Sequence, residues 1–114
     1  MLREKNRIKK RKEFRYIHKH GSPVFGTNII VLYTDNIFDN VKFGFSVSKK
    51  VGKAYLRNKI KRQLRSIIRL NIESFVPAKN YVIVAKPSIA NLTYEKIEKE
   101  LLRLMSKVKK TEEC

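Results

Sequence analysis

Apolar and polar residues follow different periods in successive segments of the chain, and these periods predict its strands. Residues 29–33, within a segment of 25–34, are apolar and mostly β-branched, as is typical of a strand buried on both faces. Residues 41–48 alternate apolar and polar side chains, the period of a half-buried strand. Because the connecting loop is short, we expect these two strands to pair as an antiparallel hairpin. Residues 81–85 are apolar throughout and predict a third strand, central in its sheet.

Three other segments show the period of an α-helix. Residues 9–20 place Phe14 and Ile17 on one face, and Gly21 with Pro23 supplies a stop. Residues 54–72 predict a long helix, and a last helix follows Thr93, a suitable N-cap, with apolar residues at helical spacing up to Val108. The order helix, strand, strand, helix, strand, helix predicts an α+β sandwich, a small mixed sheet covered by helices.

The length of 114 residues fits one domain, which we expect to span the whole chain, with a mobile basic arm at about residues 1–8 and a frayed tail at 111–114. The one cysteine, Cys114, leaves no intrachain disulfide, and we expect no disulfide-linked partner. The chain shows neither a signal-peptide pattern nor a run of 18 apolar residues, so we expect a cytoplasmic protein without a membrane partner.

Charge changes this picture most, because 27 Lys and Arg stand against 10 Asp and Glu, a formal net charge of +17. The like charges of such a chain repel one another, and the simplest explanation for so large a net charge is a polyanionic partner. The sequence therefore favours nucleic acid over an anionic membrane surface.

The basic residues gather in and before the long predicted helix, where no acidic residue occurs between Asn40 and Ile72. One side of that helix is apolar, while basic side chains spread over an arc of roughly 140° on another side. An ordinary solvated helix would intersperse Glu and Asp, so the arc predicts phosphate binding. The candidate RNA-binding residues are Lys49, Lys50, Lys53, Arg57, Asn58, Lys59, Lys61, Arg62, Arg65 and Arg69.

Two of the neighbouring positions carry more specific expectations. Gly52, just before the helix, either helps to seat a phosphate on backbone N–H groups or is a turn residue, and the sequence does not choose between the two. Asn58 can both donate to and accept from a 2′-hydroxyl or a base edge.

No catalytic constellation is visible in the sequence. The ten acids are scattered, and His18 and His20 have no evident third partner for acid and base chemistry. We therefore expect neither a catalytic residue nor a metal or cofactor site in this chain.

Residues 45–65 closely resemble the bacterial ribonuclease P protein family, in which a strand ends in Ser-Lys-Lys and a glycine precedes a helix with Arg-Asn-Arg and then Lys-Arg. The resemblance extends over nearly the whole chain, through the Lys-His-Gly end of the first helix and the Leu-Thr-Tyr-Glu start of the last. Two positions depart from the family: Lys59 stands where Arg is common, and His18 where a phenylalanine often lines a cleft.

This resemblance implies the protein component of an RNA-based endoribonuclease, with Mg²⁺-assisted chemistry in the RNA subunit. Its partners would be the ribonuclease P RNA, bound by the basic helix and the turn before it, and precursor tRNA. A cleft of Phe14, His18, Tyr33 and Lys86 would hold the single-stranded 5′ leader that the enzyme removes. The family also implies a left-handed crossover through the long helix.

Two other classes fit parts of the pattern. A small ribosomal or other structural RNA-binding protein would share the charge and the basic helix but not the motif of residues 49–65. A protein that recognises duplex DNA fits less well, because the basic helix is not directly preceded by a second helix and a tight turn, as in a helix-turn-helix motif.

Overall fold

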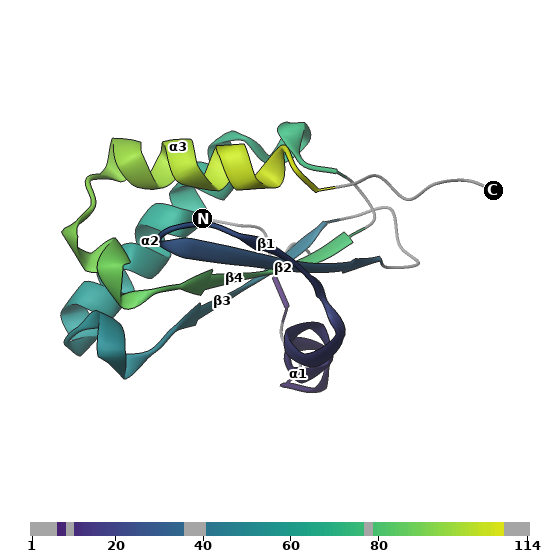
Figure 1. Ribbon diagram of the computed structural model, residues 1–114, viewed down its shortest axis with the longest axis horizontal. Coiled ribbons are helices and arrows are strands. Elements are labelled where there is room, and N and C mark those ends of the chain that lie inside the picture. Colours follow the sequence, from purple (N-terminus) through teal and green to yellow (C-terminus); the bar gives the residue numbers. More distant parts are fainter. Residues whose placement is uncertain (1–6, 9–10, 36–40, 77–78, 109–114) are drawn as a thin grey trace.

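The computed structural model describes residues 7–8, 11–35, 41–76 and 79–108 (Figure 1). Its helices are α1 (Arg11–His20), α2 (Ala54–Leu70) and α3 (Tyr94–Met105), and its strands are β1 (Ser22–Phe25), β2 (Ile29–Asp35), β3 (Lys42–Val47) and β4 (Lys79–Ala85). The three predicted helices and three predicted strands are confirmed. The α+β class is confirmed with them, and β1 is an addition.

The four strands form one mixed sheet in the order β1-β2-β4-β3. β2 pairs antiparallel with β1 and β4, whereas β3 pairs parallel with β4. The predicted antiparallel hairpin of β2 and β3 is therefore wrong, because β4 lies between them. The expectation that β4 is central is confirmed.

The chain passes from β3 through α2 to the neighbouring parallel strand β4. A parallel pair requires such a crossover, because the chain must return to the end of the sheet where it started. The left-handed sense that the family implies stays a prediction.

Strand β1 was missed because Gly21 and Pro23 indicated only the end of a helix. Pro23 lies on the sheet's outer strand, the place where a residue without an N–H is tolerated. Gly21 lets the chain turn directly from α1 into this strand: a Cβ there would lie 2.4 Å from the carbonyl oxygen of Ile17.

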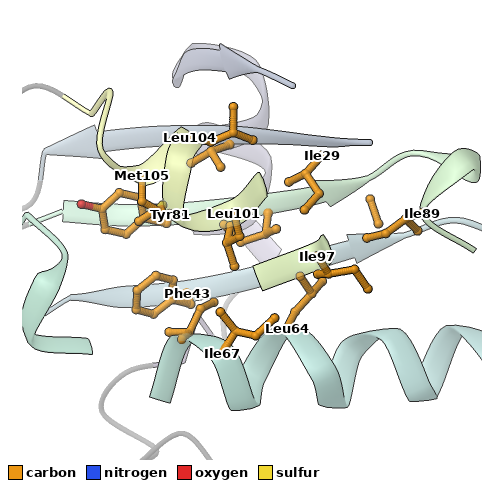
Figure 2. Close-up of a cluster of buried hydrophobic side chains, with 14 of the residues drawn as sticks. Ile29, Phe43, Leu64, Ile67, Tyr81, Ile89, Ile97, Leu101, Leu104 and Met105 are labelled. Carbon is orange, nitrogen blue, oxygen red and sulfur yellow. The ribbon is translucent and has the colours of Figure 1, made fainter. Parts of the chain in front are cut away.

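Helices cover both faces of the sheet, with α2 and α3 on one side and α1 on the other (Figure 1). The main core lies under α2 and α3 (Figure 2). There the ring of Phe43 stacks on Tyr81 with centroids 5.1 Å apart and meets Phe75 edge-on at 5.5 Å. The buried Tyr81 hydroxyl donates a hydrogen bond of 2.7 Å to the carbonyl of Val76, as a buried phenol requires.

Helix α3 is held at three places. The predicted N-cap is confirmed, since the Thr93 hydroxyl accepts a hydrogen bond from the Lys96 N–H. The carboxylate of Glu100 accepts from both the backbone and the side-chain amide of Asn28, at 2.9 and 2.8 Å. The hydroxyls of Tyr94 and Ser66 of α2 lie 3.1 Å apart.

The predicted arm and tail fall mostly outside the described residues, which include only Arg7 and Ile8 of the arm. Arg7 forms a parallel bridge with Phe43, and the Ile8 N–H donates to the Phe43 carbonyl at 2.9 Å. This part of the arm therefore lies along the outer edge of β3. Within the described residues, no helix is long and apolar enough to cross a membrane.

Candidate nucleic-acid interface

The apolar side of α2 fixes which way its basic side faces. Ile60, Leu64 and Ile67 are fully buried against the sheet and α3, and Ile68 beside them is buried too. At 100° per residue, this anchoring turns the basic arc away from the core. The predicted division of α2 into an apolar and a basic side is confirmed.

The basic arc consists of two rows. Arg57, Lys61 and Arg65 are half-buried and one helical turn apart, whereas Asn58, Arg62 and Arg69 are exposed. The guanidinium carbon of Arg65 lies 5.7 Å from the centroid of the Phe45 ring, a cation–π contact. Packing against β3 therefore positions at least one arginine of the inner row.

The Nε groups of Arg57 and Arg65 are buried and have no hydrogen-bond partner among the described residues. A buried donor without an acceptor costs about 1–3 kcal/mol. An anion that draws these guanidinium groups outward would give each donor a partner. The inner row thus has both the charge and the unsatisfied donors that suit phosphate oxygens.

The turn before α2 carries exposed Lys49, Lys50 and Lys53. Gly52 has a φ of 155°, and a Cβ there would lie 2.7 Å from Leu56 Cδ2, so the turn requires glycine. Its N–H donates to the Lys49 carbonyl and is not free for a phosphate. Of the two roles left open for Gly52, the structure supports the turn, which places three lysines at the positive end of α2.

Lys59 lies apart from the other candidates. It is exposed, and at 100° per residue it falls on the same flank of α2 as Ser66, which meets Tyr94 of α3. Lys61 and Arg65 lie on the opposite flank. The structure therefore separates Lys59 from the basic arc.

Phe14 and His18 lie together on α1. Their rings are nearly parallel, with an interplanar angle of 14° and centroids 6.4 Å apart. Phe14 packs over Gly44 of β3, where a Cβ would lie 3.0 Å from the ring. Helix α1 approaches β3 this closely because Gly44 has no side chain. His18 is exposed and free to meet a base.

The structure does not bring Tyr33 to this pair. Tyr33 lies opposite Tyr81 in the register of β2 and β4, and both rings face the core under α2 and α3. Phe14 lies on the other face of the sheet. The grouping of Tyr33 with Phe14 in one cleft is therefore wrong, because a fully apolar strand gives no sign of which residues face which side.

Lys86, the fourth residue predicted for the cleft, lies just beyond β4. Its Nζ donates to the Gly26 carbonyl at 3.0 Å, and its backbone N–H donates to the Asn28 carbonyl at 2.9 Å. Lys86 thus holds the turn between β1 and β2 and leaves a half-buried positive charge at that end of the sheet.

A hollow of about 170 Å³ at the edge of β3 joins the α1 pair to the basic arc. Phe14 lines it from α1, Phe45 from β3, Lys61 and Arg65 from α2, and Arg7 from the arm. We call this the β3 hollow. The sequence did not assign Arg7 or Phe45 to the site, although the alternation in residues 41–48 correctly placed Phe45 on the apolar side of its strand.

The arrangement suits binding to a nucleic acid. Exposed lysines precede α2, arginines with unsatisfied donors lie along its basic arc, and the half-buried ring of Phe14 meets Lys61 and Arg65 at the β3 hollow. Among the described residues, no group of three or more His, Cys, Asp or Glu side chains could hold a metal ion.

Comparison with known proteins gives a consistent picture. The Ribonuclease P family matches residues 2–109. The chain is 41% identical to the ribonuclease P protein component of Fusobacterium nucleatum, covering 91% of this chain and 97% of the relative. It is 37% identical to that of Syntrophomonas wolfei, covering 94% and 90%.

Solved structures agree with these relatives. The RNase P protein of Staphylococcus aureus superimposes with a TM-score of 0.82 at 34% identity, covering 89% of this chain and 93% of that one. The RNase P protein of Thermotoga maritima gives 0.84 at 27% identity, covering 90% and 97%. With the strand order and the basic helix already described, these matches show that the chain belongs to the bacterial ribonuclease P protein component family.

Proposed function

We propose that the basic arc of α2 and the turn before it, with Lys49, Lys50 and Lys53, bind the RNA subunit of ribonuclease P, while Phe14 and His18 hold the single-stranded 5′ leader of precursor tRNA. The observation that carries the proposal is the β3 hollow, in which Phe14 of α1 and Lys61 and Arg65 of α2 line one cavity. A leader lying on α1 would thus be contiguous with RNA bound to α2.

The chemistry of each part fits its role. Lysines and arginines neutralise phosphates regardless of sequence, and flat rings stack on any base. A processing enzyme that meets many leaders needs this kind of tolerance. We assign the cleavage step and its Mg²⁺ to the RNA subunit, and to this chain the positioning of RNA and leader.

The first test is reconstitution with a bacterial ribonuclease P RNA. At low Mg²⁺, where RNA alone cleaves poorly, we expect added protein to restore removal of the 5′ leader from precursor tRNA. Cleavage rates measured with and without protein decide the matter. No gain over RNA alone would refute the role in cleavage and leave a structural RNA-binding protein.

The second test addresses the leader. Phe14→Ala should lower the affinity of the reconstituted enzyme for precursor tRNA about five-fold or more, the loss of one stacked base, while leaving its affinity for mature tRNA unchanged. Circular dichroism and thermal unfolding check that the variant folds. Equal losses on both RNAs would show that Phe14 serves packing over Gly44.

A further inference from the structure

The face of the sheet that carries α1 has an exposed ring that none of the roles above uses. Phe25, in β1, is 70% exposed. The strand register places it beside Ile30 of β2, Ile30 beside Val84 of β4, and Val84 beside Ser46 of β3. We call this line across all four strands the outer row.

The outer row lies on the same face as α1. Gly44, two residues before Ser46, contacts Phe14, and Leu32, two residues after Ile30, lies near Ile17 beside Gly21. Side chains two apart in a strand share a face. Val82, in the neighbouring row beneath α1, is 0% exposed, whereas each member of the outer row is exposed or half-buried. Helix α1 therefore covers one row and leaves the next open.

The open row lies on the Phe14 and His18 side of α1. The opposite flank of the helix, with Tyr16, borders Thr34 and Asn80 at the other end of the sheet. By the helical period, Phe14 and His18 project from the flank away from Tyr16. The surface that begins at these two rings therefore continues over Ser46, Val84 and Ile30 to Phe25.

The shape and chemistry of this surface indicate which kind of ligand it binds. A flat apolar row that ends in an exposed ring stacks well on nucleotide bases, as sheet surfaces of RNA-binding domains do. The half-buried charge of Lys86 lies next to it, through the bond to Gly26. A second copy of the chain would bring another +17 charge against this one, which disfavours self-association.

We propose that Phe25 is an additional stacking site for the single-stranded leader, reached by nucleotides farther from the cleavage site than those at Phe14. β1 is separated from β3 by three strand spacings, about 14 Å. Since α2 packs beside β3, the far edge of the sheet lies away from the bound RNA subunit. This inference rests on the proposed function and extends the leader path across the whole sheet.

The test uses the reconstituted enzyme and precursor tRNAs whose leaders differ only in length. Phe25→Ala should weaken binding of long-leader precursors about five-fold or more, with no change for the shortest leader that still contacts Phe14, or for mature tRNA. Phe25→Tyr keeps a ring and should restore the affinity. Tyr16→Ala, which removes an exposed ring from the other flank of α1, is the matched control and should have no effect at any length.

A spectroscopic readout separates stacking from a change in folding. The chain contains no tryptophan, so Phe25→Trp introduces a single indole whose emission is distinct from that of the five tyrosines. Its emission should be quenched when a single-stranded RNA oligonucleotide of leader sequence is added to the reconstituted enzyme, and the emission of Tyr16→Trp should not.

Several outcomes would overturn the inference. An equal loss at all leader lengths, the absence of quenching, or a change in oligomeric state caused by Phe25→Ala would each do so, the last by showing an interface between copies. A wild-type enzyme that does not prefer precursor over mature tRNA would instead refute the proposed function. The two failures are therefore distinguishable.

Discussion

The two faces of the sheet are both apolar, yet they are buried to different extents. Under α2 and α3, Phe43, Tyr81 and Leu64 are buried to the last few per cent of their surface. On the face of α1, one row is covered by Ile17 and Phe14, and the outer row stays half open. A single strand such as β4 contributes to both, through Ile83 on one side and Val84 on the other.

This difference in burial means that one face of the sheet stabilises the fold and the other is available to bind a partner. A sealed face gains its free energy from burial and close packing. A half-open face forgoes part of that burial and keeps apolar surface for a partner. Substitutions on the sealed face should therefore change folding, and those on the open face should change binding.

The largest expected effect is on the sealed face. Leu64→Ala leaves a cavity among fully buried neighbours and should lower the free energy of unfolding by about 2–5 kcal/mol. Val84→Ala removes methyl groups from a half-buried site in the outer row and should cost less than about 1 kcal/mol. Urea denaturation measures both. Similar decreases in the free energy of unfolding for the two variants would show that both faces contribute equally to stability.

Next in size is an effect on RNA binding with little change in folding. Arg65→Ala should weaken binding to ribonuclease P RNA about ten-fold and reduce the slope of log affinity against log salt by about one unit, the loss of one phosphate contact. Lys59→Ala, on the opposite flank of α2, is the matched control. If Lys59→Ala had the larger effect, the interface would lie on the side of α2 that faces α3.

The smallest expected effect concerns a single hydroxyl in the core. Burial, with Tyr33 and Asp35 nearby, raises the pKa of the Tyr81 phenol above its ordinary value near 10. The folded protein therefore keeps this proton where the unfolded chain loses it, and above about pH 10 this group should lower the free energy of unfolding by about 1.4 kcal/mol per pH unit.

Tyr81→Phe tests that sign. The variant should lose about 1 kcal/mol at neutral pH, because the hydrogen bond to Val76 is gone. Above pH 10, its stability should fall less steeply than that of the wild type. Parallel urea titrations at pH 8 and pH 11 give the comparison, and identical slopes would mean that the phenol ionises freely in the folded state.

Local patterns predicted local structure well. The 3.6-residue period located α2, the Thr93 cap located α3, and the alternation of residues 41–48 placed Phe43, Phe45 and Val47 on one side of β3. These features depend on neighbours in sequence. The division of α2 into an apolar and a basic side followed from the same period.

What the sequence could not predict depends on distant partners. Nothing in residues 29–33 indicates that β4, some fifty residues later, pairs with β2 in place of β3. The same uninterrupted apolar run hid the fact that Tyr33 faces the core. The β3 hollow needs Arg7, Phe14 and Arg65 from three separate segments, so no local pattern could assemble it.

Because Gly44 has no side chain, the residues tolerated at positions 44 and 14 depend on each other. Phe14 rests directly on this backbone, so that even a methyl group at residue 44 would press on the ring. A smaller side chain at residue 14 would relieve that pressure. Gly44→Ala should therefore lower the free energy of unfolding less when Phe14→Leu is also present, although the ring that stacks on the leader is then lost. Which substitutions evolution accepts at either position then depends on the residue at the other.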